Sequence, residues 1–348
     1  MRSPWRDAQG GNGAGGEMRR IRITGTGMAV PAQATSAAQL DARLGLPAGS
    51  SERQTGVRRR FLSTTETAAQ LAAQACRAAV ADAGLDWSEI DCLVAASATM
   101  DQSLPYNAAL IHAELGLSER RTATLDINAS CLSFLAALDT MSYLVDAGRY
   151  RNVLLVSCDI ATFGIDWSAL RESGIFGDGA AAAVIRRSRA DEASAILSAR
   201  METLSAGVAH CRIPAGGSRY HPRRALDRPF EPLTVFHMEG RAVFKLASEA
   251  LPGFTEGLLA QAGVRMGDLA AVVPHQASQL ALTHLSRRLD IAPAQLVDIF
   301  ADYGNQVGAS LPTALHLGRA QGRFRHGDTI LLLGTGAGLA MGGMVLTV

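Results

Sequence analysis

Residues 76–99 read CRAAVADAGLDWSEIDCLVAASAT, and residues 255–278, TEGLLAQAGVRMGDLAAVVPHQAS, can be laid on them without a gap. Each stretch begins with apolar residues at helical spacing and reaches an Ala-Gly pair, which is typical of a helix end. A short acidic turn then leads into an apolar run, which we expect to be a buried strand over residues 92–96 and again over 271–274. This internal repeat predicts one helix–turn–strand unit used twice.

A second pair of segments repeats in the same order. GRYRNVLLVSCD (148–159) resembles GRFRHGDTILLLGTG (322–336), since each has a basic turn followed by a continuous apolar run. Apolar strands that alternate with helices are typical of mainly parallel sheets covered on both faces. We therefore predict an α/β protein of two related halves, residues 19–190 and 191–348, whose sheets pack against a shared helical layer. Loops at the strand ends of both halves should meet at the active site.

The composition excludes several classes of protein. Hydrophobic residues make up 48% of the 348 residues and charged residues 19%, which allows a sizeable core. The net charge of +1 gives no reason to expect a nucleic acid or a membrane surface as partner. No apolar run is long enough to predict a membrane span. Residues 1–18 are polar and glycine-rich without the apolar stretch of a signal peptide, so we expect a disordered tail there.

The five cysteines include no CxxC pair, which argues against a disulfide framework or a zinc site and favours a reducing cytoplasm. Cys131 lies in TLDINASCLSFLAAL (124–138), where a strand end gives way to small residues and a helical pattern. A helix N-terminus favours the thiolate, the form that attacks thioesters, although a buried structural cysteine is the alternative. The others lack this context and are interpreted as structural: Cys76, Cys92, Cys158 and Cys211.

Two more polar residues follow apolar segments. His275, in AAVVPHQAS (270–278), comes directly after a predicted strand, where it could reach a central cleft as acid, base or hydrogen-bond donor. A histidine satisfied inside the fold is an equal alternative. Asn305, in ADYGNQVGASLPTAL (301–315), lies in a loop, and a Tyr-Gly-Asn sequence alone is more often a turn than a catalytic amide.

The glycines of LLLGTGAGLAMGG (331–343) follow an apolar run and contain a GxGxG pattern. A dinucleotide-binding loop would need a following helix and an acidic residue further on, and the sequence shows neither. A turn that presents backbone N–H groups to an oxyanion is the better interpretation.

Taken together, these motifs resemble the β-ketoacyl-acyl-carrier-protein synthase III family of the thiolase superfamily. The matching pieces are DINASCLSF, GIFGDGAAAAV (174–184), VPHQAS and YGNQVGASLP, and the resemblance extends over nearly all of residues 20–348. It implies a five-layered αβαβα fold, a homodimer and a ping-pong reaction. The expected substrates are thioesters of coenzyme A or of an acyl carrier protein, with no metal and no bound cofactor.

The resemblance also assigns roles to individual residues. Cys131 would carry the acyl group, while His275 and Asn305 would stabilise the enolate formed by decarboxylation of a malonyl thioester. The backbone N–H groups of Cys131 and Ala337 would form the oxyanion hole. Leu104 would reach into the acyl tunnel of the partner subunit, where many relatives have a large aromatic residue, so acyl groups longer than acetyl are expected.

Other positions depart from the family pattern. Ser50 stands where the family usually has a tryptophan that packs on coenzyme A, and Gln54 replaces a usual arginine. Ser278 and Leu280 replace an asparagine and an arginine. These changes favour a specialised paralogue of secondary metabolism over the initiator of fatty-acid synthesis. Three basic residues match positions for carrier-protein docking, although a solvated helix face explains them equally well: Lys245, Arg287 and Arg288.

Three functions compete on this sequence. The leading one is a ketosynthase that condenses the Cys131 acyl group with a malonyl thioester. The alternative is an acyltransferase of the same fold that passes this group to an oxygen or nitrogen acceptor. The third is a non-catalytic subunit, which the complete Cys–His–Asn set disfavours. Enzymes of olefin biosynthesis place a carboxylate where this chain has Leu104, so no general base is expected there.

Overall fold

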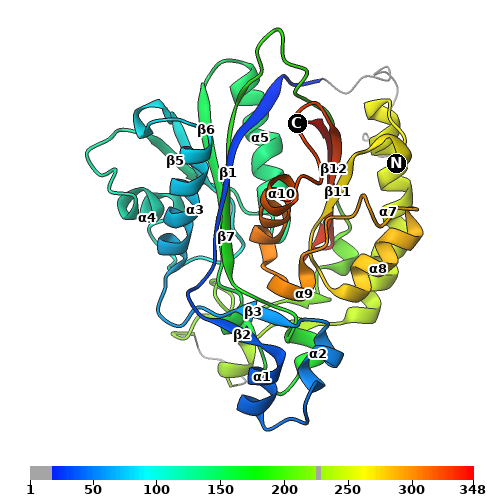
Figure 1. The fold of residues 1–348 in the computed structure, drawn as a ribbon. Helices are drawn as coiled ribbons and strands as arrows, with labels where there is room; N and C mark the ends of the chain where they lie inside the picture. Colours follow the sequence, from blue (N-terminus) through cyan, green and yellow to red (C-terminus); the bar gives the residue numbers. More distant parts are fainter. Residues whose placement is uncertain (1–17, 225–228) are drawn as a thin grey trace, which may run out of the picture.

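A computed structural model of the chain describes residues 18–224 and 229–348, and its layers are visible in Figure 1. Two β-sheets are separated by a central layer of helices, and further helices cover the outer face of each sheet. The predicted αβαβα fold is confirmed. Apart from the exposed Met18, the tail predicted over residues 1–18 lies outside the described residues.

The first sheet has five strands in the order β1-β7-β6-β4-β5. They are β1 (Ile21–Ala29), β7 (Gly179–Arg187), β6 (Asn152–Asp159), β4 (Cys92–Ala95) and β5 (Ala123–Asp126). β4 is parallel to both β6 and β5, whereas β7 is antiparallel to both β6 and β1. β5 therefore forms one edge of this sheet.

The second sheet repeats this arrangement with four strands in the order β11-β12-β13-β8. They are β11 (Ala271–Pro274), β12 (Thr329–Gly336), β13 (Ala340–Thr347) and β8 (Ala195–Thr203). β11 is parallel to β12, and β13 is antiparallel to both β12 and β8, as in the first sheet. In the second sheet, a parallel bridge between Val272 of β11 and Leu296 is the counterpart of the β4–β5 pairing in the first.

Each sheet has a helix that precedes the equivalent strand in the chain. α3 (Ala68–Asp82) leads through a 3₁₀ turn, η2 (Trp87–Glu89), to β4, and α7 (Gly240–Ala262) leads through η6 (Met266–Asp268) to β11. These are the two units that the sequence repeat predicts, and the repeat is confirmed as a helix–turn–strand unit. The strands come from residues 21–187 and 195–347, while the division into domains at residue 190 stays a prediction.

The central layer consists of α5 (Ser133–Asp146) and α10 (Ser310–Ala320), which share one apolar core with the inner faces of both sheets. α3 and α4 (Asn107–Glu114) cover the outer face of the first sheet. α7 and α8 (Gln279–Arg288) cover the second. The layers pack closely because small residues line their contacts: a Cβ added at Gly27 of β1 would lie 2.5 Å from the Ala75 carbonyl oxygen of α3.

Shorter elements surround the site end of the molecule. The helices are α1 (Ala37–Leu44), α2 (Ser50–Thr55), α6 (Leu170–Ser173) and α9 (Phe300–Tyr303). The 3₁₀ turns are η3 (Thr162–Gly164), η4 (Ser205–Gly207), η5 (Glu231–Leu233) and η7 (Val307–Ala309). Two small ribbons pair β2 (Ala34–Ser36) with β3 (Arg59–Phe61) and β9 (Cys211–Arg212) with β10 (His237–Met238). No helix among the described residues has the length and apolarity needed to cross a membrane.

Candidate active site

Cys131 lies in the loop that joins β5 to α5, two residues before the helix starts. The preceding residue, Ser130, adopts a positive φ of 55°, which is rare outside glycine. Its carbonyl oxygen accepts a hydrogen bond from the Ser133 hydroxyl at 2.7 Å, and that hydroxyl accepts one from the Ala129 N–H at 2.9 Å. The first turn of α5 therefore holds this tight turn in place and directs the thiol into a cavity.

His275 directly follows the last residue of β11, so the strand end delivers it to the same cavity. Its backbone N–H donates to the Leu333 carbonyl oxygen at 2.8 Å, which ties it to β12. Gly334 makes room for it, because a Cβ there would lie 2.8 Å from the His275 Cβ. The imidazole is buried, and its Nδ1 has no hydrogen-bond partner among the described residues.

Asn305 lies between α9 and η7, just before α10. Its backbone pairs with the loop before β7, since its N–H donates to the Ile175 carbonyl oxygen at 2.8 Å and its carbonyl oxygen accepts from the Gly177 N–H at 3.1 Å. The side-chain Nδ2 donates to the Ala277 carbonyl oxygen at 3.2 Å, and Oδ1 accepts from the Val307 N–H at 2.8 Å. The amide is thus oriented from both ends, with one Nδ2–H left for a ligand.

Ala337 lies in the turn between β12 and β13. This turn approaches the nucleophile closely, since a Cβ added at Gly336 would lie 3.6 Å from the Cys131 Cβ. The backbone N–H groups of Ala337 and of Cys131 itself both act as hydrogen-bond donors that favour the charged form of the thiol.

One cavity of about 1140 Å³ joins these groups, and Cys131, His275, Asn305 and Ala337 all line it. Part of its wall is formed by α7 and α8, whose facing side chains are mainly apolar; on this wall lie Val243, Phe244, Ala247, Leu251, Ala281 and Leu285. The charged residues of the wall are all arginines: Arg171, Arg212, Arg241 and Arg288. No carboxylate of the described residues lines the cavity, so it is suited to an anionic ligand with an apolar part.

Burial sets the acid–base state of the two central groups. It raises the pKa of Cys131 to about 12, with further raising by the nearby Cys211 and lowering by the Ala337 N–H. Desolvation of the charge thus opposes the effect of the N–H groups at the helix N-terminus, which favour the thiolate, and has the larger influence on this pKa. Burial also lowers the pKa of His275 to about 4, so the imidazole is neutral near pH 7.

Of the remaining predicted residues, some line the active-site cavity and others lie outside it. Arg288 lines the cavity, whereas Lys245 and Arg287 are exposed on α7 and α8 outside it. Leu104 is 84% exposed on the loop before α4 and does not line the cavity of its own chain. Ser50, at the position of the family's tryptophan, is buried under α1.

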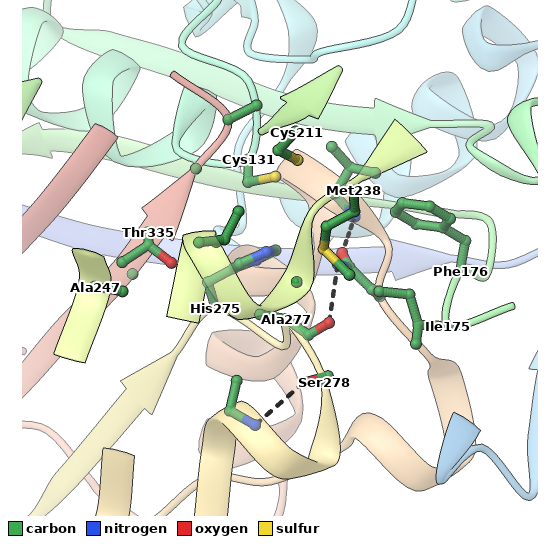
Figure 2. Close-up of a pocket in the computed structure, with 18 of the residues that line it drawn as sticks. Cys131, Ile175, Phe176, Cys211, Met238, Ala247, His275, Ala277, Ser278 and Thr335 are labelled. Atoms are coloured by element: carbon green, nitrogen blue, oxygen red, sulfur yellow. Dashed lines mark hydrogen bonds between the residues drawn. The ribbon is translucent and has the colours of Figure 1, made fainter. Parts of the chain in front are cut away.

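Cys211 is the residue that the sequence interpretation missed. Cys76, Cys92 and Cys158 are buried in the core, as structural cysteines are. Cys211 instead lines the cavity from β9, and Figure 2 shows its sulfur beside that of Cys131. No local pattern in the sequence could have revealed this, since the two cysteines are brought together only by the β9–β10 ribbon.

Comparisons with known proteins agree with this geometry. Sequence models of 3-oxoacyl-[acyl-carrier-protein] synthase III match residues 125–205, and those of its C-terminal part match residues 259–348. The β-ketoacyl-[acyl-carrier-protein] synthase III of Symbiobacterium thermophilum is 32% identical over 95% of this chain and 98% of its own. The crystal structure of 3-oxoacyl-(acyl carrier protein) synthase III from Pseudomonas aeruginosa PAO1 has 30% identity and a TM-score of 0.82, over 94% of this chain and 98% of its own.

OleA of Xanthomonas campestris shares the fold, with a TM-score of 0.81 at 22% identity over 95% of this chain and 98% of its own. At that identity the likeness concerns the fold alone. The full-length match to the synthase III relative, together with the family motifs around Cys131, His275 and Asn305, is decisive for the assignment. The chain belongs to the 3-oxoacyl-(acyl-carrier-protein) synthase III family.

Proposed function

We propose that this protein is a β-ketoacyl synthase of the synthase III type, which loads an acyl group on Cys131 and condenses it with a malonyl thioester. One observation carries the proposal: a single cavity brings together a thiol with two N–H donors, a neutral imidazole and an oriented amide. Each of these groups has a task in the two half-reactions.

In the first half-reaction the Cys131 sulfur attacks the carbonyl carbon of the acyl thioester. The thiol is protonated near pH 7, so its proton must leave as the bond between sulfur and carbon forms. The oxyanion of the tetrahedral intermediate accepts hydrogen bonds from the N–H groups of Cys131 and Ala337. When it collapses, the C–S bond to the donor breaks, and the donor thiol leaves with the proton.

In the second half-reaction the malonyl thioester loses carbon dioxide and becomes an enolate. A neutral imidazole and a carboxamide can each donate a hydrogen bond to its oxygen, which is the role proposed for His275 and Asn305. The enolate carbon attacks the acyl carbonyl, and the Cys131 sulfur leaves and regains its proton. Decarboxylation supplies the carbanion, so formation of the enolate requires no general base. This agrees with the cavity wall, where no carboxylate of the described residues lies.

The wall of the cavity supports a thioester with a phosphate and an apolar chain. The four arginines of the wall suit the phosphates of coenzyme A or of a carrier protein's phosphopantetheine. The apolar face between α7 and α8 suits an acyl substrate longer than acetyl. The exposed Lys245 and Arg287, with Arg288, form a basic surface to which we assign docking of an acidic carrier protein.

We further propose a homodimer and a cytoplasmic location. β5 is an edge strand of the first sheet, and beside it lie the exposed Leu104 and Tyr106, whose hydroxyl is 2.8 Å from the Thr124 hydroxyl of β5. A free edge with apolar neighbours supports pairing with a second copy. The departures at Ser50 and Gln54 support a specialised role in secondary metabolism rather than initiation of fatty-acid synthesis.

The test combines intact mass with release of carbon dioxide. Wild-type protein should gain one acyl group from coenzyme A thioesters of medium chain length, and Cys131→Ala should gain none. Adding malonyl-carrier protein should release carbon dioxide from wild type, whereas Asn305→Ala should still be acylated but release at least about tenfold less. Cys76→Ala, in the alanine-rich α3, is the matched control.

Two results would contradict the proposal. Acylation without release of carbon dioxide, together with transfer to an amine or alcohol, would establish the acyltransferase instead. Preferential labelling by acetyl donors would exclude the expected longer chain.

A further inference from the structure

Cys211 is a second thiol in the active-site cavity, and the proposed reaction gives it no task. Among the five cysteines, all of which lie in the described residues, Cys131 and Cys211 are partly accessible and the others are buried. Both line the same cavity, and a charge on Cys211 would raise the pKa of Cys131, so the two thiols are close enough to interact. The Claisen step needs no base, so a thiol at this place calls for another explanation.

The ribbon that carries Cys211 is much shorter than the strands of the two central sheets. β9 has two residues, and it pairs only with β10, where Cys211 is opposite Met238. Few hydrogen bonds tie the adjoining backbone: the Glu239 N–H donates to the His210 carbonyl oxygen and the Phe236 N–H to the Gly164 carbonyl oxygen, both at 2.8 Å. The side chains of His210 and Glu239 also pair, with Nδ1 and Oε2 2.9 Å apart. Such a ribbon can adjust more readily than a strand inside a sheet, which matters because a disulfide requires a narrow range of Cα separations.

We propose that Cys211 is the resolving thiol for reversible oxidation of Cys131, so that the pair is a modification site for hydroperoxides. In the first step the Cys131 sulfur attacks one peroxide oxygen and the O–O bond breaks. The leaving oxygen departs as water or an alcohol with a proton, and Cys131 becomes a sulfenic acid. In the second step the Cys211 sulfur attacks the Cys131 sulfur, the S–O bond breaks, and water leaves. Two thiols have then lost two protons and two electrons to the peroxide.

The neighbours of Cys131 suit the intermediate. The N–H groups of Cys131 and Ala337, which converge on the sulfur, can donate to the sulfenate oxygen as they would to an acyl oxyanion. A sulfenic acid without a nearby thiol proceeds to sulfinic acid, which ordinary thiols do not reduce. A disulfide to Cys211 would block acylation but keep the nucleophile recoverable.

The experiment treats the purified, unliganded protein with a small excess of hydrogen peroxide and follows intact mass and Cys131 acylation. Wild type should lose about 2 Da, and digestion should yield a disulfide-linked peptide pair containing Cys131 and Cys211. Acylation should fall by at least about tenfold and return after dithiothreitol. The Cys76→Ala control should behave as wild type.

Cys211→Ala and Cys211→Ser, each compared with its own untreated activity, should instead gain about 32 Da at Cys131 and stay inactive after dithiothreitol. The proposal is overturned if wild type gains the same mass at the same rate as these variants, or if no Cys131–Cys211 peptide forms. Because the readout is the mass of the protein and the state of Cys131, it is independent of whether carbon dioxide is released in the condensation.

Discussion

Cys131 and His275 are both uncharged near pH 7, because desolvation by the surrounding protein disfavours the charged form of each. At Cys131, burial raises the pKa while two N–H donors that favour the thiolate lower it, and burial has the larger effect. The residue therefore needs a proton acceptor before it can attack a thioester. His275, with a pKa of about 4, is too weak a base to hold that proton, and it stays neutral over the whole physiological range, where it can donate a hydrogen bond.

Alkylation of Cys131 by iodoacetamide should report this state. With a pKa of about 12, the thiolate fraction, and hence the alkylation rate, should rise about tenfold per pH unit up to at least about pH 10. The rate is followed by intact mass, with Cys131→Ala to identify labelling of Cys211. A plateau near pH 8.5, as for an ordinary cysteine, would contradict a desolvated thiol.

His275 should also make stability depend on pH. Its pKa is about 4 in the folded protein against 6.5 unfolded, so between these values only the unfolded chain binds the proton. The free energy of unfolding should therefore fall as pH falls through that window, by about 2 kcal/mol from pH 7 to pH 5 from this residue. Urea unfolding of His275→Gln should lack this component.

The exposed His326, changed to Gln in the same way, is the control for that measurement. The assignment is wrong if His275→Gln and wild type lose the same free energy between the two pH values.

At the scale of elements, the two helices of the central layer start at the two halves of the site. Cys131 precedes α5 and Asn305 precedes α10, while the end of β6 bonds both the loop after β4 and the segment after Asn305. Asp159, its last residue, accepts hydrogen bonds from the Ala98 N–H at 2.9 Å and the Gly308 N–H at 2.8 Å. The site is therefore held by the ends of elements from both halves, and one strand end links them.

Gly304 is the backbone position on which the Asn305 loop depends. Its φ of 68° and ψ of −165° belong to a region that only glycine occupies readily, and an added Cβ would lie 2.7 Å from the Ile175 carbonyl oxygen. Gly304→Ala should cost at least about 3 kcal/mol of stability and lower release of carbon dioxide more than acylation. Thermal unfolding and the two activity assays measure these effects.

Gly322 offers a matched control. It has the same φ of 68°, but an added Cβ would meet nothing within 4 Å. Gly322→Ala should cost only about 1 kcal/mol and keep both activities. If both variants behave alike, the close contact at Gly304 has no role in holding Asn305.

At the scale of the whole molecule, the edge formed by β5 should decide the oligomeric state. Leu104 is 84% exposed near this edge. Leu104→Asp should weaken a homodimer by at least about tenfold in dissociation constant, because a charge would be buried in an apolar contact. Sedimentation velocity over a range of concentrations measures this shift.

Val208, 61% exposed next to η4, can be changed to Asp as the control. A sedimentation profile of Leu104→Asp that equals that of wild type would remove this loop from the interface.

The sequence by itself determined the family, the repeated helix–turn–strand unit and the candidates Cys131, His275 and Asn305. These are readable because each is written in a local pattern: apolar spacing, an Ala-Gly helix end, or a polar residue directly after a strand. The repeat also indicated that two strand ends would face each other, since equivalent units place their loops at equivalent ends.

Only the tertiary structure decided what depends on segments far apart in the chain. The burial that raises the pKa of Cys131 could not be predicted, because the residues that line its cavity are spread along the chain from Gln54 to Leu339, which no local pattern records. Cys211 was interpreted as structural for the same reason, since its neighbour is set by the β9–β10 ribbon folding over the cavity. Desolvation and proximity are properties of the packed chain, whereas helix and strand periodicity are properties of the sequence.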